Sequence, residues 1–247
     1  MCIFMKKENS QGPISQINFS LRKLTLRKPL LSLAIVSGLL LANLIQTPAL
    51  ADFEAGWTAY QNGNFAKALK EWRVLAKKGD AKAQFNLGVM YDEGRGVKED
   101  RQKAINWWVK AAERKNKEAQ HNLGMTYLFG SGVNIDYVKA VSWLKKASNQ
   151  GSARSQYSLG KMYSEGLGVK KDKTEAFNWI MRAAESGVYQ AQYNLGKIFR
   201  DGRGVERDAK KAAQWFLAAA KQGYAKAQNH IGVRLARGEG IAKNEVE

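Results

Sequence analysis

The chain has 247 residues, 45% of them apolar, and a formal net charge of +18. It is therefore long and apolar enough to form one or two domains with a hydrophobic core. Its only cysteine is Cys2, so the rest of the chain holds no disulfide, no thiol nucleophile and no cysteine metal site. None of its three prolines lies beyond Pro48, and Ala, Lys, Gln and Leu are abundant, which favours helix over strand.

Residues 1–51 have the pattern of a secretory signal peptide. A basic segment precedes an uncharged apolar run at 30–45, and Ala49 and Ala51 then occupy the small-residue positions of a cleavage site. We therefore predict cleavage after Ala51 and a periplasmic or secreted mature protein. The alternative is an uncleaved membrane anchor, for which an apolar run of 16 residues is short.

Removal of residues 1–51, which contain six Lys/Arg and one acidic residue, leaves a net charge of +13. A surplus of this size favours acidic proteins, anionic envelope polymers or lipid headgroups as partners. Nucleic acid is not expected, because an exported protein seldom meets it. Contact with the membrane is expected only through the export signal.

The rest of the chain repeats itself with a period of 36 residues. Residues 52–80 are predicted to form a divergent helical pair that caps the N-terminal end. Four complete copies and one partial copy follow, at 81–116, 117–152, 153–188, 189–224 and 225–247. The partial copy is predicted to supply a single capping helix at the C-terminal end.

The first helix of each copy is predicted from apolar residues at helical spacing, such as Leu87 and Tyr91. A glycine recurs in the middle of this helix, at Gly88, Gly124, Gly160, Gly196 and Gly232. Glycine inside a helix costs about 1 kcal/mol relative to alanine, so a repeated glycine needs a repeated reason. We expect a neighbouring helix to approach closely at each position.

The second helix of each copy is predicted to begin at an aspartate that accepts hydrogen bonds from free backbone amides. These aspartates are Asp100, Asp136, Asp172 and Asp208. Alanines then alternate with one tryptophan column, which is predicted to pack in the core: Trp107, Trp143, Trp179 and Trp215. The pattern assigns no place to Trp57, Trp72 or Trp108.

Glycines are also predicted to end the second helices in the left-handed conformation, at Gly79, Gly151, Gly187 and Gly223. The first complete copy has Lys115 at this position, and we expect Asn116 to adopt the left-handed conformation instead. Between the two helices, Gly94 and Gly96 recur in every copy while the acidic residues around them vary. This spacing therefore indicates a corner of the fold and not a phosphate or cation site.

No single helix pair can bury its apolar face alone, whereas stacked pairs can. The predicted fold is all-α, a right-handed α/α superhelical solenoid of antiparallel helix pairs with a 36-residue period.

The repeated columns read A-x-Q-x-x-L-G-x-x-Y-x-x-G-x-G-V-x-x-D, followed by A, W, A-A and G. This pattern resembles the Sel1-like repeat family, a relative of the tetratricopeptide repeat with a longer loop between its helices. The resemblance implies an α/α superhelix that acts as an adaptor for proteins, often at bacterial envelopes or host interfaces. Some relatives carry paired cysteines that clamp each repeat and are associated with penicillin binding, and this chain lacks those cysteines.

The sequence contains no convincing catalytic or metal-binding pattern. Two serine–lysine pairs, Ser142/Lys145 and Ser158/Lys161, have the spacing of acylating serine enzymes, but the other copies do not retain it. The two histidines, His121 and His230, fall in different columns, and no carboxylate pair recurs with either. We therefore predict a non-enzymatic protein without a metal or cofactor.

By analogy with tetratricopeptide arrays, the first helices are expected to line the concave surface. Three variable columns on them form a candidate groove with an aromatic ladder, an apolar part and a basic end. Its residues are Phe85, His121, Met125, Leu128, Tyr157, Lys161, Tyr193, Lys197 and Arg200. Such a groove suits an extended peptide or a helix with apolar anchors and acidic residues. The alternative is that these aromatic residues pack between first helices and bind nothing.

The leading functional hypothesis is an exported scaffold that binds a protein or peptide, with acidic character, in this groove. The alternative is an envelope protein that binds anionic glycan or lipid through its basic surface. Salt distinguishes the two, because polymer or headgroup binding should collapse near about 0.5 M salt, where the Debye length falls to about 4–5 Å.

Overall fold

The computed structural model describes residues 51–237, and the statements below refer to these residues. Residues 1–50 of the predicted signal peptide and the last ten residues of the partial copy lie outside them. Eleven helices and no strand occur in the described part of the chain. Their bounds are α1 Phe53–Gln61, α2 Phe65–Lys77, α3 Ala81–Glu93, α4 Arg101–Glu113, α5 Lys117–Phe129, α6 Tyr137–Asn149, α7 Ala153–Glu165, α8 Lys173–Glu185, α9 Tyr189–Asp201, α10 Ala209–Lys221 and α11 Ala225–Arg237.

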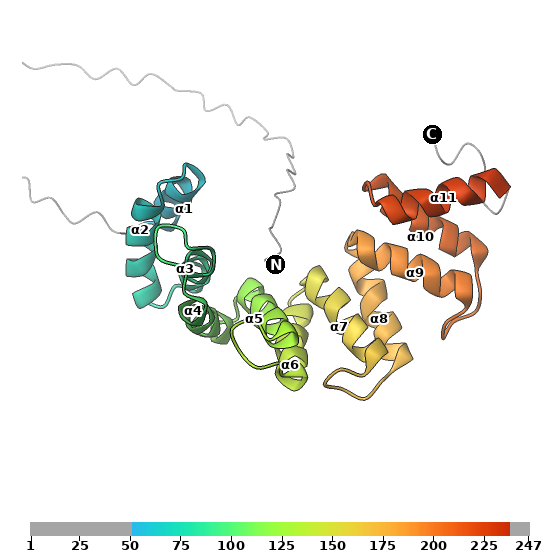
Figure 1. Cartoon of the computed structure of the whole chain (residues 1–247), viewed down its shortest axis with the longest axis horizontal. Coiled ribbons are helices and arrows are strands. Elements are labelled where there is room, and N and C mark those ends of the chain that lie inside the picture. Colours follow the sequence, from blue (N-terminus) through green and yellow to red (C-terminus); the bar gives the residue numbers. More distant parts are fainter. Residues whose placement is uncertain (1–50, 238–247) are drawn as a thin grey trace, which may run out of the picture. The chain divides into compact units, whose positions relative to one another are not determined.

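The helices pack in the order of the chain (Figure 1). Each first helix packs most extensively on the second helix of its own copy, as α3 does on α4 and α7 on α8. Each second helix also packs on the first helix of the next copy, as α4 does on α5. The prediction of an all-helical array of stacked helix pairs is therefore confirmed. None of these helices combines the length and the apolar character that crossing a bilayer requires.

The core of each pair is built around one large side chain on the second helix. This buried column lies one position after the tryptophan column that was predicted to form the core. Its members are Trp72, Trp108, Leu144, Ile180 and Phe216, all at most 5% exposed. In the predicted column only Trp179 is buried, and Trp107, Trp143 and Trp215 are half-buried. The core prediction was thus wrong by one residue, and it left the two most buried tryptophans unassigned.

The mid-helix glycines lie against this buried column. A Cβ atom on Gly160 would lie 2.8 Å from Cγ1 of Ile180 and 3.1 Å from the backbone oxygen of Ala176. Gly88, Gly124 and Gly196 meet Trp108, Leu144 and Phe216 in the same way. The expected close approach is therefore confirmed at the four complete copies, and its cause is the large side chain opposite. Gly232 differs, because no described atom lies within 4 Å of its added Cβ.

A glutamine column joins successive copies. Nε2 of Gln120 donates to the backbone oxygen of Ala112, eight residues earlier, at 3.0 Å. The same bond recurs from Gln84, Gln156, Gln192 and Gln228. Each bond adds a second donor to a carbonyl in the last turn of the preceding second helix, which also accepts the backbone amide three residues further on.

The predicted helix caps are mostly confirmed. The side chains of Asp100, Asp136, Asp172 and Asp208 accept hydrogen bonds from backbone amides of the first turn. At the end of α4, however, Lys115 itself adopts the left-handed conformation, with φ 62°. Asn116 is extended, with φ −66°, and caps α5 through a 2.8 Å bond from the amide of Ala119. The expectation that Asn116 would be left-handed was wrong, because this residue is needed as the cap of the next helix.

Candidate protein-binding site

The aromatic column of the candidate groove lies at the fifth residue of successive first helices. Phe85 on α3 is partly buried and packs against the core between α4 and α5. Tyr157 on α7 and Tyr193 on α9 are also partly buried and pack against the C-terminal core cluster. The Tyr157 hydroxyl accepts a hydrogen bond from Nδ2 of Asn194 at 3.0 Å, which links α7 to α9. Each of these rings is therefore partly covered by neighbouring helices and partly exposed.

His121 occupies the same column on α5, but it is only 6% exposed. Its Nδ1 lies 2.8 Å from Oγ of Ser155 on α7. Burial and, to a smaller extent, the nearby positive charge of Arg154 lower the pKa of His121 to about 4. The imidazole is therefore neutral near pH 7 and serves as a link between first helices, with little surface to offer a ligand.

Met125 and Leu128 on α5 are partly buried and pack against the core cluster that contains Leu144 and Leu159. Ser158 on α7 donates a hydrogen bond from Oγ to Sδ of Met125 at 3.6 Å. This serine belongs to one of the serine–lysine pairs, and its hydroxyl is directed to a thioether, which cannot act as a general base. The apolar part of the groove is thus largely occupied by neighbouring copies.

The basic part of the groove lies on α7 and α9. Lys161 is exposed, and the ammonium of Lys197 lies 5.9 Å from the ring centre of Tyr193. Arg200 is paired with Asp201, with 2.6 Å between Nε and Oδ1, and this pairing holds the pKa of Asp201 below its ordinary value. The charge available to a ligand therefore comes mainly from the two lysines. Of the nine predicted residues, the structure brings Tyr157, Tyr193 and Lys197 together through α9.

The second helices carry a feature that the sequence analysis missed. A cation three residues after the tryptophan lies over its ring in three copies. The distances to the ring centre are 4.6 Å for Lys110 over Trp107, 4.0 Å for Lys146 over Trp143 and 4.8 Å for Arg182 over Trp179. Cation–π contacts of this kind contribute about 0.5–1 kcal/mol at exposed sites. The signal was present in the sequence as a tryptophan followed by Lys or Arg at the third position.

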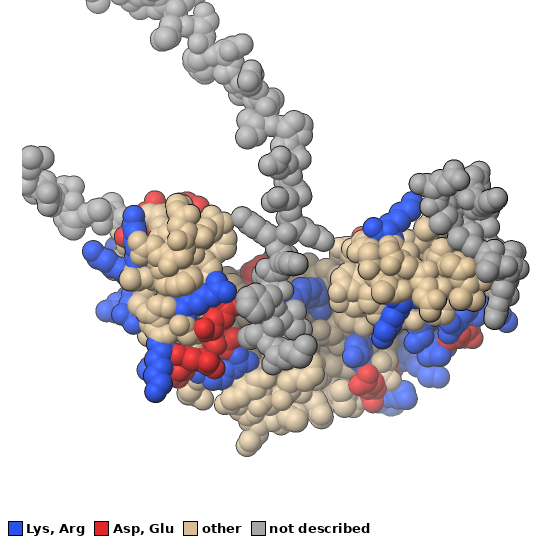
Figure 2. All heavy atoms as spheres, turned by 45° about the horizontal axis from the view of Figure 1, so that its top comes forward, with Lys and Arg blue, Asp and Glu red and all other residues tan. Residues whose placement is uncertain are grey.

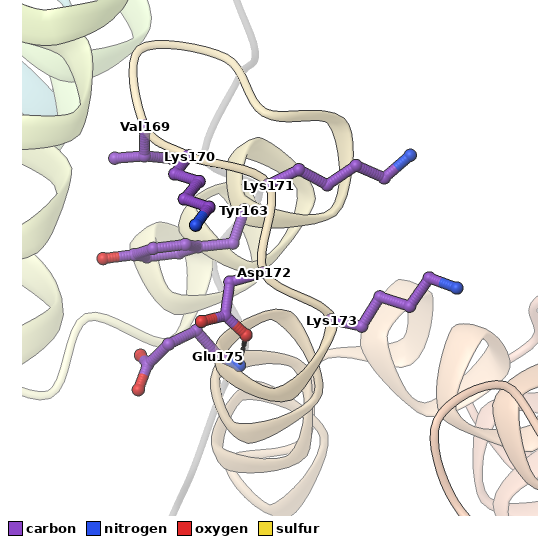
Figure 3. Close-up of a pocket in the computed structure, with 7 residues that line it drawn as sticks. All are labelled: Tyr163, Val169, Lys170, Lys171, Asp172, Lys173 and Glu175. Atoms are coloured by element: carbon purple, nitrogen blue, oxygen red, sulfur yellow. Dashed lines mark hydrogen bonds between the residues drawn. The ribbon is translucent and has the colours of Figure 1, made fainter.

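The loop between α7 and α8 surrounds an open hollow (Figure 3). Its lining residues are Tyr163, Val169, Lys170, Lys171, Asp172, Lys173 and Glu175. Figure 3 shows the ammonium of Lys170 close to the Tyr163 ring, while Lys171 and Lys173 extend away from the hollow. Asp172 is occupied as the cap of α8, since its Oδ1 accepts the amides of Thr174 and Glu175 at 2.9 Å. The hollow presents mixed charges and no pair of groups arranged for proton transfer.

Metal binding finds no support in residues 51–237, where no three side chains of His, Cys, Asp or Glu are grouped to hold an ion. The accessible chemistry is that of aromatic rings and lysines on helical surfaces. Aromatic side chains are enriched at protein–protein interfaces.

The chain matches the family model described as Sel1 repeat at residues 81–116, 117–152, 153–188, 190–224 and 225–247. It is similar to the crystal structure of a Sel1 repeat protein from Oxalobacter formigenes, with 32% identity, a TM-score of 0.72, and coverage of 77% of this chain and 79% of that one. It is also similar to c5321, a protective antigen of uropathogenic Escherichia coli with an SLR fold, with 37% identity and a TM-score of 0.71. That match covers 75% of this chain but only 41% of c5321. Comparison with curated proteins gives no significant match.

Proposed function

Because the chain belongs to the Sel1 repeat family, whose members generally mediate protein–protein interactions, we propose that it is an exported, non-enzymatic scaffold that binds a protein or peptide on its first helices. The observation that carries this proposal is the surface of α7 and α9. There, half-buried Tyr157 and Tyr193 stand beside the cations Lys161 and Lys197. Rigid rings next to lysines suit a peptide with apolar and acidic residues.

Export is supported by the basic segment, apolar run and small-residue cleavage site in residues 1–51. A protein that acts in the envelope would meet its partner there. The partner should therefore be sought by affinity capture from the envelope fraction of the producing cells, followed by identification of the captured protein and measurement of its affinity by calorimetry.

The binding surface is tested by reversing charge at its two lysines. Lys161→Glu with Lys197→Glu should weaken binding of the identified partner at least tenfold. The matched control is Lys145→Glu with Lys210→Glu, which changes the net charge equally at two exposed lysines on the second helices α6 and α10. We expect this control to bind within about twofold of the wild type. Equal losses in both variants would indicate charge attraction without a defined surface and would contradict the proposal.

The aromatic rings need a more careful test, because they also pack against the core. Tyr157→Ala with Tyr193→Ala should abolish binding while also lowering the melting temperature. Full affinity in a folded double variant would show that the ladder does not bind the partner.

A second candidate function is binding of an anionic glycan or lipid, which the net charge of +13 after residue 51 favours. Binding in about 0.5 M salt separates the candidates, because exposed charges are screened there. Retention of affinity supports the aromatic surface, and collapse supports the anionic polymer.

A further inference from the structure

The corner between α5 and α6 exposes four apolar side chains. Phe129 is 64% exposed, Ile135 56%, Tyr137 37% and Val138 68%. Phe129 ends α5, and Tyr137 and Val138 begin α6. Ile135 lies against the cap of α5, because a Cβ on Gly130 would be 2.8 Å from its Cγ1. These four residues, called the apolar corner below, are therefore grouped at one end of a helix pair.

The other copies carry charge at the same place. Residues 129–138 contain one charged side chain, Asp136, whereas the corresponding stretches 93–102, 165–174 and 201–210 contain six, five and six. The position of Phe129 is acidic in all three, and the position of Ile135 holds a glutamate, a lysine or an arginine. The helix ends in a left-handed glycine in each case, with φ between 65° and 76°. The same corner thus folds with charged residues, so folding does not require the apolar ones.

An exposed apolar group that folding does not require indicates an interaction site. In Figure 2, a surface without Lys, Arg, Asp or Glu lies in the lower middle of the view, and charged residues lie on both sides of it. Scattered single apolar residues need no explanation, but four at one corner would lower solubility unless a partner covered them.

The apolar corner adjoins the lysine-bearing loop of the next copy. A Cβ on Gly168 would lie 2.8 Å from Cβ of Tyr137, so the loop between α7 and α8 touches the start of α6. This loop carries Lys170 and Lys171, and Lys173 begins α8 (Figure 3). In Figure 3, Lys171 and Lys173 extend towards the following copy, away from α5 and α6, so Lys170 is the cation of this loop that continues the apolar surface.

We propose that the apolar corner and Lys170 together dock an amphipathic segment of a partner protein, with apolar anchors on the corner and an acidic side chain at Lys170. The inference rests on the proposed scaffold function but places binding at the helix corner and not on the first helices. Charge favours this occupant over a second copy of the chain, because a second copy would bring two lysine-bearing loops together.

The test uses substitutions that the other copies already tolerate. Phe129→Glu, Ile135→Lys and Val138→Thr place in this corner the residues found at 165, 171 and 174, and together they leave the net charge unchanged. The matched control is Val74→Lys, which replaces a 41% exposed apolar residue on α2 with the lysine of the next copies. Circular dichroism and melting should be unchanged in both variants.

The probe is a fluorescein-labelled 16-residue peptide with a helical stripe of Leu and Phe and an opposite face of Asp and Glu. Its binding to the protein is measured by fluorescence anisotropy. Two control peptides are compared with this probe. The first keeps the apolar stripe and has Lys in place of Asp and Glu. The second keeps Asp and Glu and has Ser in place of Leu and Phe. We expect the full probe to bind the wild-type chain at least tenfold more tightly than either. The triple variant should lose at least tenfold, and Val74→Lys should stay within twofold.

Three results would contradict the proposed docking site. The first is that the full probe does not bind, or that it binds the triple variant as tightly as the wild-type chain. Loss of probe binding only in Lys161→Glu with Lys197→Glu would overturn it too, while supporting the first-helix surface. In the last experiment, binding of the wild-type chain and the triple variant to vesicles of phosphatidylcholine and phosphatidylglycerol at 3:1 is measured. Vesicle binding that the triple variant loses, without any effect on the peptide, would assign the corner to a lipid surface and contradict a polypeptide occupant.

Discussion

Gly196 on α9 lies against the ring of Phe216 on α10, and a Cβ atom on the glycine would stand 2.8 Å from Cδ1 and Cε1 of that ring. Phe216 is fully buried, so its ring cannot swing away from an added methyl group. The glycine thus lowers helix propensity in α9 but permits a large residue to fill the space between the two helices.

Gly196→Ala should therefore destabilise the protein, although alanine favours helix. Overpacking costs about 1–3 kcal/mol, which exceeds the gain of about 1 kcal/mol from propensity. The matched control is Gly232→Ala, where no described atom lies within 4 Å of the new Cβ. Urea denaturation should show a lower free energy of unfolding for the first variant and an equal or higher one for the second. A stabilised Gly196→Ala would show that the two helices separate easily.

Lys115→Gly should stabilise the protein. Lys115 has φ 62°, a conformation that costs a residue with a side chain about 1 kcal/mol and costs glycine little. Part of this gain is lost because glycine makes the unfolded chain more flexible, so we expect about 0.5–1 kcal/mol. The reverse change in the next copy, Gly151→Ala at φ 80° in open space, should destabilise by about 1 kcal/mol. Thermal melting should show a higher melting temperature for Lys115→Gly and a lower one for Gly151→Ala.

Gln120→Ala should weaken the contact between the first two complete copies. Gln120 is 3% exposed, donates to the backbone oxygen of Ala112, and accepts at 2.7 Å from Nε2 of Gln150. The Ala112 carbonyl keeps its bond from the Lys115 amide at 3.0 Å, but the substitution removes both hydrogen bonds of the buried Gln120 amide, which contribute about 0.5–1.5 kcal/mol each. Gln228→Ala is the control, since Gln228 is exposed and its bond is 3.4 Å long. Chemical denaturation should show less than about 0.5 kcal/mol for this control, and equal losses would contradict a buried bond.

His121 should make stability depend on pH. Burial lowers its pKa from 6.5 to about 4, so between these values the unfolded chain binds a proton that the native chain does not. The stabilising contribution of the neutral His121 is therefore fully present above pH 6.5. As the pH falls towards 4, the free energy of unfolding decreases by about 3 kcal/mol in total. In His121→Gln the decrease over this range should be smaller by about that amount. Parallel pH profiles for the two proteins would show that His121 is protonated without cost in the native state.

The local features of the fold could be predicted from the sequence. The aspartate caps, the left-handed glycines and the repeat period depend on residues within a few positions of one another. Such signals survive in any context that keeps the helices. Even here one local competition was missed, because Asn116 serves as the cap of α5 and Lys115 must take the left-handed conformation.

The candidate site could be predicted less well. His121 and Tyr157 belong to one column, yet one is buried beside Ser155 and the other is half-buried beside Asn194. Their accessibility depends on which residues the neighbouring copy presents, and spacing within one copy does not contain this information. The apolar corner left a signal in the sequence, a phenylalanine in an otherwise acidic column, but only its exposure distinguishes it from core.

The sequence by itself determined that this protein is an array of 36-residue helix pairs of the Sel1 repeat type, where each pair begins and ends, and that a mid-helix glycine meets a neighbour. The tertiary structure decided which column fills the core. Trp107 and Trp108 are adjacent in the chain, and both lie on helix faces that neighbours partly cover, so helical periodicity allows either one to be buried. Trp108 is the buried one because it faces the space that Gly88 leaves open on α3. That space exists only after the two helices have packed together.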